Sequence, residues 1–129
     1  MSKQPYVLDA SALLALLNRE PGADRVAAVM AGARISAVNL IEVISKLIDK
    51  GLDGPTVVAG LSELDIIVVD MDRPQAERAG LLRRETRALG LSLGDRACLA
   101  LALDSGSIAL TGDRAWAALT LGIEVELVR

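Results

Sequence analysis

The sequence contains no histidine, a single cysteine and very few aromatic residues. Histidine is the usual acid–base group at neutral pH and a common zinc and copper ligand, so its absence leaves carboxylates and hydroxyls to supply any chemistry. Cys98 stands alone inside an apolar helical stretch, which excludes a disulfide framework and a zinc-binding pattern. Tyr6 and Trp116 are the only aromatic residues, so aliphatic side chains must fill the core, and Trp116 is better explained by packing than by base stacking.

Long apolar runs are also absent. The longest run, Ala97 to Leu103, falls far short of the roughly 18 residues that a membrane span needs, so we expect no membrane contact. The N-terminus carries one lysine, Lys3, and a short apolar stretch broken by Asp9, which lacks the graded regions and the cleavage site of a signal peptide. We therefore expect a cytoplasmic protein.

The length of the chain, 129 residues with 52% hydrophobic content, suits one hydrophobic core and leaves no room for two. We interpret residues 1–129 as a single domain because repeats, low-complexity tracts and linkers are missing. A net charge of −3 disfavours nucleic-acid binding at first sight. The charge is unevenly distributed, however: residues 1–72 hold ten acids and six bases, whereas residues 73–114 hold five acids and seven arginines.

Apolar periodicity and capping residues predict strands that alternate with helices. The predicted strands are residues 6–9, 34–36, 66–69, 107–110 and 124–128. The predicted helices are one ended by Pro21-Gly22, then Ala23–Met30, one ending at Lys50, Thr56–Leu64, Pro74 to about Leu89, Leu93–Asp104, and a short one near Trp116. This order, without a hairpin signal, predicts an α/β fold with a mainly parallel sheet covered on both faces.

Four acidic residues are predicted to meet at one edge of this sheet. Asp9 ends the first strand and Asp113 follows the fourth. Glu42 and Asp95 lie in the first turns of crossover helices, which begin at the carboxyl edge of a parallel sheet. Clustered carboxylates repel one another unless a cation neutralises them, and oxygen-only ligands favour Mg²⁺ or Mn²⁺. Such an ion activates water for attack on phosphorus, so phosphodiester hydrolysis is the reaction that fits.

Each of these acids also has an ordinary structural interpretation. The segment Ser92–Asp95 matches a capping box, and Asn39–Glu42 has similar spacing. Asp9 and Asp113 can each cap the helix that follows. Taken singly, each acid is as easily a helix cap as a ligand. Four such acids at one edge are harder to explain as caps alone.

Four further residues stand beside the predicted ligands. Ser11 and Thr111 each lie two residues from one of the acids, where a hydroxyl orients a ligand or water, or makes a local turn bond. Arg96 and Arg114 directly follow an acid, so either can contact the scissile phosphate or pair with its neighbour. The other arginines of residues 73–114 fit a solvated helix face better than an RNA track.

The order and local context of the four acids resemble a known family over essentially the whole chain. The segments that carry the resemblance are Val7–Ser11, Glu42, Leu91–Arg96 and Thr111–Arg114. They are similar to PIN-domain ribonucleases, specifically the VapC-type toxins of bacterial toxin–antitoxin pairs. The resemblance implies a three-layer α/β/α fold and endonucleolytic cleavage of RNA. It also implies that the four acids form a Mg²⁺ or Mn²⁺ site.

The same resemblance implies partners. It predicts a homodimer and a cognate VapB-type antitoxin, which in the family wraps the toxin and blocks its acidic groove. The joint complex is expected to bind its own promoter. Transfer RNA is the first candidate substrate, although selectivity depends on surface shape that the sequence does not define.

Two other classes of protein stay in competition. Phosphoaspartyl hydrolases and receiver domains place an aspartate after the first strand, but such a phosphatase needs a second acid where Ser11 stands, a receiver needs adjacent acids, and no lysine follows Lys50. A non-catalytic binding module, whose acids only receive arginines from a partner, is the remaining alternative. The substitution Asp95→Asn separates it from a nuclease.

Overall fold

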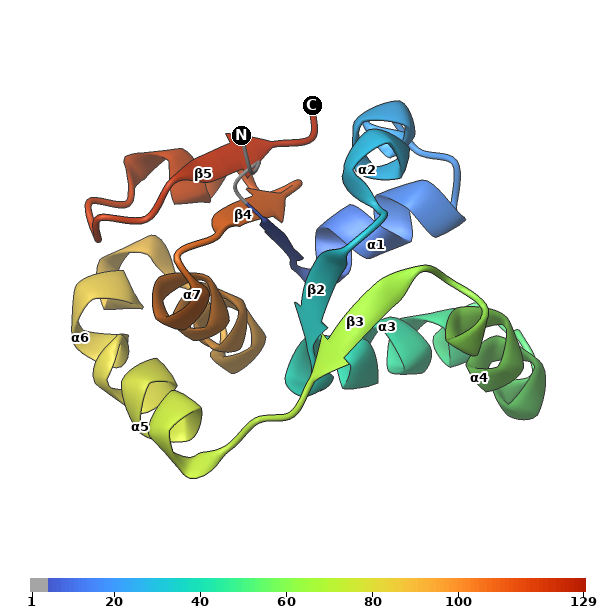
Figure 1. Ribbon diagram of the computed structural model, residues 1–129, viewed down its shortest axis with the longest axis horizontal. Helices are drawn as coiled ribbons and strands as arrows, with labels where there is room; N and C mark the ends of the chain where they lie inside the picture. The colour runs from blue at the N-terminus through green and yellow to red at the C-terminus, as the bar shows by residue number, and fades with distance from the viewer. Residues whose placement is uncertain (1–4) are drawn as a thin grey trace.

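A five-stranded sheet runs through the middle of the molecule (Figure 1). The computed structural model describes residues 5–129, so Lys3, on which part of the signal-peptide expectation depends, lies outside the described range. The strands stand in the order β3-β2-β1-β4-β5, and all four pairings among the described residues are parallel. They are β1 (Tyr6–Leu8), β2 (Ala33–Ser36), β3 (Ile66–Val69), β4 (Ile108–Thr111) and β5 (Val125–Leu127). Each of the five predicted strands is confirmed to within two residues.

Helices cover both faces of the sheet (Figure 1). One face carries α1 (Ala10–Leu17), α2 (Ala23–Val29), α3 (Ala37–Asp49) and α4 (Gly54–Ser62). The other carries α5 (Arg73–Leu81), α6 (Arg83–Thr86), the 3₁₀ helix η1 (Arg87–Leu89), α7 (Leu93–Ser105) and the 3₁₀ helix η2 (Arg114–Ala118). The predicted three-layer α/β/α fold is confirmed. Among the described residues, no helix has the length and apolar character needed to span a bilayer.

Alternating strand residues divide the core between the two faces. Val7 of β1 and Ala109 of β4 point to one face and join α7 and Trp116 in a single cluster. Their neighbours Leu8 and Leu110 point to the other face and pack with α1 and α2. This alternation follows from the two-residue repeat of a strand. Trp116 is completely buried, as expected of a packing residue.

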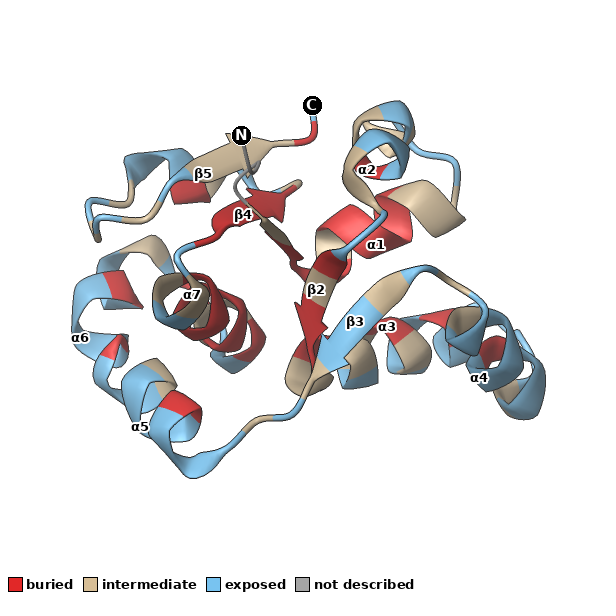
Figure 2. Cartoon of the chain, in the orientation of Figure 1, coloured by how far each residue is buried: buried red, intermediate tan, exposed pale blue. Residues whose placement is uncertain are grey.

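Helix α7 holds the longest continuous run of buried residues among the described helices (Figure 2). Every residue from 97 to 102 is at most 3% exposed, which confirms the expectation from a run that is apolar on every face. Its start is fixed by a reciprocal pair of bonds, in which the Asp95 amide donates to Ser92 Oγ and the Ser92 amide donates to the Asp95 carboxylate. A helix anchored in this way holds its first turn rigidly at the carboxyl edge of the sheet.

The prediction of one helix from Pro74 to about Leu89 is wrong. The structure breaks this segment into α5, α6 and η1, and the first break falls at Leu82. Leu82 is buried in the cluster around α7, and the Thr86 hydroxyl donates to its carbonyl at 2.8 Å. The packing of Leu82 accompanies a bend of the chain around α7 (Figure 1). The Thr86 bond spans four residues, as a straight helix also allows, so it does not cause the break. Gly90, at a φ of 67°, ends the segment as predicted.

Candidate active site

The predicted acids lie at the carboxyl edge of the sheet or on helices that start there. Asp9 directly follows β1 and Asp113 lies two residues beyond β4, and these strands are neighbours. Glu42 lies in the second turn of α3, which begins directly after β2 on the other side of β1. Asp95 lies in the first turn of α7. The element order therefore brings the four acids to the same side of the fold.

Asp9 is only 3% exposed and is held by three donors. Ser11 Oγ and the Ala12 amide donate to its Oδ1 at 2.7 and 2.8 Å, and Thr111 Oγ1 donates to its Oδ2 at 2.5 Å. Burial raises the pKa of the Asp9 carboxyl, and the negative charge of Asp95 raises it further. The three hydrogen bonds lower it, but burial dominates, and the pKa is about 6. The carboxylate is therefore oriented by the fold, and residues 5–129 give it no positively charged partner.

The hydroxyls of Ser11 and Thr111 join two loops at this edge. Besides binding Asp9, Ser11 Oγ accepts from the Gly112 amide at 2.9 Å and lies 3.4 Å from Thr111 Oγ1. Thr111 Oγ1 in turn accepts from the Asp113 amide at 3.0 Å. The structure thus places both hydroxyls where they orient Asp9, and Thr111 does so from a different strand.

Glu42 lies against the first turn of α7. Asn39, which is 1% exposed, donates through Nδ2 to Glu42 Oε1 at 2.8 Å and to the Gly94 carbonyl at 2.9 Å. A Cβ built on Gly94 would overlap the Glu42 carboxylate. Glycine at this position therefore leaves the space in which Glu42 approaches α7, and Asn39 holds it there.

Asp95 caps the start of α7, and its charge also acts on the buried Cys98 thiol. Its amide and carboxylate exchange hydrogen bonds with Ser92 at 3.1 and 2.9 Å, so the predicted capping box is present. One turn further on, burial raises the pKa of the Cys98 thiol, and the charges of Asp9, Asp95 and Glu42 raise it further. The charges of three carboxylates, one directly after β1 and the others on α3 and α7, therefore act on the same buried thiol.

Asp113 is exposed and caps η2, because the Ala115 amide donates to its Oδ1 at 3.0 Å. Within residues 5–129, no three acidic or thiol side chains stand close enough together to ligate one ion. The donor set nevertheless fits a hard divalent cation, because it consists of carboxylate oxygens and no cationic side chain of the described part of the chain pairs with buried Asp9. Asp95 and Asp113 each bond a backbone N–H at a helix start, and rotation of either side chain would exchange that bond for a cation.

The two arginines predicted beside the ligands differ in their surroundings. Arg96 Nη1 donates to the Ala79 carbonyl of α5 at 3.0 Å, so its half-buried side chain links α7 to α5. The guanidinium is therefore directed toward α5 and not toward Asp95. Arg114, the first residue of η2, is exposed. Of the two, Arg114 keeps the accessible position that a phosphate contact needs.

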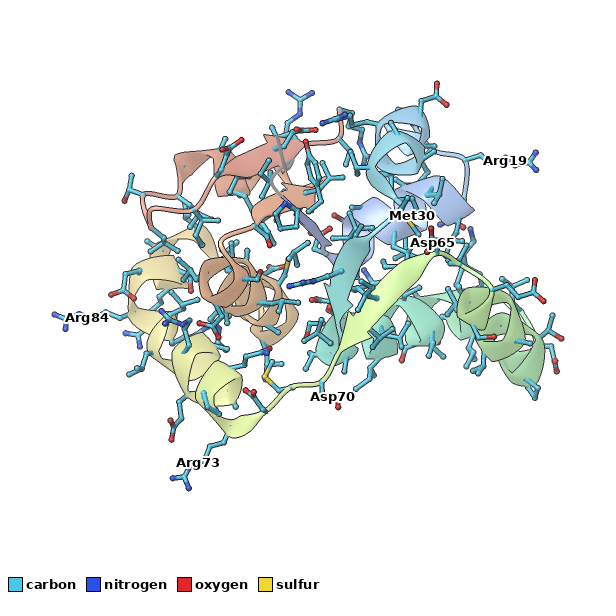
Figure 3. The ribbon with its side chains drawn as sticks, in the orientation of Figure 1. Arg19, Met30, Asp65, Asp70, Arg73 and Arg84 are labelled. Atoms are coloured by element: carbon cyan, nitrogen blue, oxygen red, sulfur yellow. The ribbon has the colours of Figure 1, made fainter. Side chains whose placement is uncertain are left out.

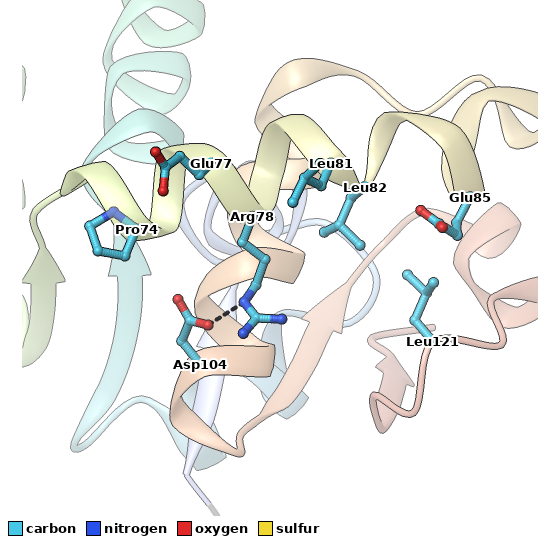
Figure 4. Close-up of a pocket in the computed structure, with 8 residues that line it drawn as sticks. All are labelled: Pro74, Glu77, Arg78, Leu81, Leu82, Glu85, Asp104 and Leu121. Atoms are coloured by element: carbon cyan, nitrogen blue, oxygen red, sulfur yellow. Dashed lines mark ion pairs between the residues drawn. The ribbon is translucent and has the colours of Figure 1, made fainter.

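The arginines of α5 and α6 face outward or are paired. Arg78 forms an ion pair with Asp104 of α7 across a pocket that also holds Glu77 and Glu85 (Figure 4). Arg73 pairs with Glu77, one turn along its own helix. The side chains of Arg73 and Arg84 point away from the body of the protein (Figure 3). This arrangement agrees with the interpretation of these arginines as a solvated helix face.

Two residues of the edge were not predicted from the sequence as site residues. Asn39 was considered only as a helix cap, although its spacing of three residues from Glu42 on one helix places both on the same face. Arg129 lies next to the loop after β4, where a Cβ on Gly112 would be 3.5 Å from Arg129 Nη2 and 3.3 Å from Ser11 Oγ. No local pattern in the sequence connects Arg129 to this loop.

The pKa of Asp9 predicts a pH-dependent difference between the wild type and Asp9→Asn in chelator. The carboxyl has a pKa of about 6 in the folded protein, above its ordinary value of 3.8, so the unfolded chain releases this proton first as pH rises. The wild-type free energy of unfolding then falls between about pH 4 and 6 by about 3 kcal/mol relative to the variant. Urea unfolding of both proteins at pH 4, 5, 6 and 7 measures this difference. A difference that stays constant across this range would contradict the prediction.

Comparisons with known proteins were consistent in fold. The family model described as "PIN domain" matches residues 6–120. A toxin–antitoxin complex from Klebsiella pneumoniae is similar with a TM-score of 0.77 and 21% identity over 96% of this chain and 98% of that chain. No curated protein sequence matches the chain.

Two further solved structures are similar over most of their length. DNA-bound VapBC from Salmonella typhimurium has a TM-score of 0.72 and 23% identity over 98% of this chain and 100% of that chain. The sarcin–ricin loop cleaving toxin VapC20 of Mycobacterium tuberculosis has a TM-score of 0.73 and 21% identity over 89% of this chain and 96% of that chain. At these identities the likeness shows a shared fold.

Proposed function

The chain belongs to the PIN-domain family, and from this premise we propose that it is a Mg²⁺- or Mn²⁺-dependent endoribonuclease, the toxin of a toxin–antitoxin pair. The observation that carries the proposal is the state of Asp9, which is buried, bound by three donors and, among residues 5–129, without a positively charged partner. Glu42 and Asp95 lie on the same side of the fold, in the first two turns of α3 and α7. Neighbouring carboxylates repel one another, and this repulsion destabilises the folded state unless a bound cation neutralises it.

In this proposal Asp9, Glu42, Asp95 and Asp113 hold the ion. When bound, Mg²⁺ or Mn²⁺ lowers the pKa of a water molecule and offsets the charge of the scissile phosphate. The protein contributes orientation: Ser11 and Thr111 fix the Asp9 carboxylate, and the Asn39 amide fixes Glu42. Exposed Arg114 is the better placed of the two predicted arginines to contact a phosphate.

The products follow from the side chains available. The sequence has no histidine to remove the proton of a ribose 2′-hydroxyl, so water is the expected nucleophile. Attack by water leaves a 5′-phosphate and a 3′-hydroxyl. We propose RNA as the substrate, with transfer RNA as the first candidate, and the neighbour described as a sarcin–ricin loop cleaving toxin adds ribosomal RNA as a second.

Two protein partners belong to the proposal. Several structural neighbours are toxin–antitoxin complexes, and two of them are bound to DNA, which supports a cognate VapB-type antitoxin for this chain. A homodimer is also proposed. The edge strand β3 exposes Ile67 and Val68, 50% and 43% accessible, and apolar surface of this kind is commonly buried between subunits.

Cleavage of a structured RNA by the purified protein tests the proposal directly. We expect cutting with Mg²⁺ or Mn²⁺, complete loss in EDTA and recovery when excess metal is restored. The new ends are expected to carry a 5′-phosphate, detected by ligation to an adaptor that requires it. Cutting that continues in EDTA, or cyclic phosphate ends, would overturn the mechanism. Binding of RNA without cleavage under any metal would support the non-catalytic binding module.

A further inference from the structure

A pocket with three basic side chains runs along α1 and α3, from Ser11 near the carboxylate edge to Asn18 and Lys50 at the opposite ends of these helices. It has a volume of about 420 Å³ and lies between α1 and α3. Lys46 and Lys50 of α3 line it together with Arg129, and Ser11 forms part of its wall. None of these residues belongs to the arginine-rich segment 73–114 that drew attention in the sequence.

Ser11 connects this pocket to the carboxylates. Its hydroxyl donates to Asp9 Oδ1 at 2.7 Å and accepts from the Gly112 amide at 2.9 Å. The guanidinium of Arg129 lies against the same loop, with Nη2 3.5 Å from the Cβ position of Gly112. The pocket therefore begins one side chain away from Asp9.

A hydrogen bond to the Pro21 carbonyl holds the Arg129 side chain in place and leaves other N–H donors of the guanidinium available. Its Nη1 donates to the Pro21 carbonyl at 2.9 Å, which fixes the guanidinium at this edge. A guanidinium carries five N–H donors, so this bond leaves enough for a two-point contact with a phosphate. Lys50 Nζ donates to Asn18 Oδ1 at 3.0 Å and also keeps further donors.

We propose that this pocket binds the sugar–phosphate backbone of the RNA strand beyond the scissile bond, with Arg129 nearest the carboxylates and Lys46 and Lys50 contacting phosphates further along. The proposal rests on the nuclease function proposed above and adds the path of the strand. The strand leaves the carboxylates over α1 and α3, away from the arginines of α5 and α6.

The competing surface over α5 is electrostatically worse for a phosphate. There Arg78 is paired with Asp104 and Arg73 with Glu77, and the pocket in Figure 4 is lined by Glu77 and Glu85. The pocket at Arg129 also contains two acids, Glu20 and Asp49, against its three bases. Removal of one of these acids should therefore strengthen phosphate binding. The proposal can thus be tested by a variant that binds RNA more tightly as well as by variants that bind it more weakly.

Binding of a fluorescent single-stranded RNA, measured by polarisation in EDTA so that no cleavage occurs, tests the pocket. We expect Arg129→Gln and Lys50→Gln each to weaken binding about three- to tenfold at low salt. Each is also expected to reduce the slope of log K against log salt by about 0.7, the value for one lost phosphate contact on a single strand. Asp49→Asn is expected to tighten binding. The matched controls are Arg84→Gln and Glu63→Gln, which remove the same charges from exposed positions outside the pocket.

The outcomes distinguish a failure of the pocket proposal from a failure of the nuclease proposal. Unchanged binding in Arg129→Gln and Lys50→Gln, or an equal loss in Arg84→Gln, would overturn the pocket even if the wild type cuts RNA with Mg²⁺. Weakened binding in the pocket variants alone supports it, even if the wild type cuts nothing and the nuclease proposal fails. Absence of RNA binding by the wild type would overturn the pocket outright. Melting temperatures of all variants, expected within a few degrees of the wild type because these side chains are exposed, exclude unfolding as the cause.

Discussion

Asp95→Asn is expected to lower the rate of RNA cleavage about a thousandfold while the protein stays folded. A thousandfold loss corresponds to about 4 kcal/mol of transition-state stabilisation, a reasonable cost for one anionic ligand of a catalytic ion. Asparagine keeps the size of the side chain and an oxygen that accepts the Ser92 amide, so the start of α7 should survive. Single-turnover cleavage in saturating Mg²⁺ measures the rate, and circular dichroism with thermal melting measures the fold.

Asp53→Asn is the matched control for Asp95→Asn. Asp53 also caps a helix, accepting the Thr56 amide at 3.1 Å at the start of α4, but α4 packs at the far end of α3 from the carboxylate edge (Figure 1). The substitution removes the same charge from the same kind of position, and we expect the cleavage rate to stay within twofold of the wild type. Wild-type cleavage by Asp95→Asn would assign Asp95 to capping alone and remove it from the proposed ion site.

The fold was predictable from the sequence because its units are local. The strands are short runs rich in apolar residues, and α1, α3, α4, α5 and α7 each begin at a residue whose side chain caps the first turn. Hydrophobic periodicity and capping or turn residues therefore define most of the elements. The break at Leu82 was not predictable in this way. It depends on Leu82 packing against α7, a contact that exists only once α5 and α7 lie together.

The site was predictable where it depends on element ends. Asp9 and Asp113 follow strands, and Glu42 begins a crossover helix, so parallel topology places them at one edge. Arg129 was not predictable, because its approach to Gly112 depends on β5 pairing beside β4, and the order of strands in a sheet is a non-local property. Arg96 extends to the Ala79 carbonyl of α5 and not toward Asp95, since successive residues on a helix point in different directions.

Gly94→Ala is expected to reduce cleavage about a hundredfold without unfolding the protein. The added methyl would lie 2.5 Å from Glu42 Cδ, and α7 cannot retreat because its buried body and its capping box hold it. Glu42 must therefore turn away and lose the hydrogen bond from Asn39. Misplacement of a reacting group by about 1 Å costs on the order of a hundredfold in rate. The melting temperature should change little, because alanine favours a helix over glycine by about 0.5–1 kcal/mol and offsets part of the lost contact.

Two comparisons make the result for Gly94→Ala decisive. Gly80→Ala in α5 adds the same methyl where nothing lies within 4 Å, so it should leave cleavage unchanged and raise the free energy of unfolding by up to about 1 kcal/mol. Glu42→Asp shortens the side chain that the methyl displaces. If the loss in Gly94→Ala comes from that displacement, adding it to Glu42→Asp should cost much less than it costs alone, because neighbouring substitutions that act on one contact are not additive. Additive losses in the double variant would place the effect of Gly94→Ala somewhere other than Glu42.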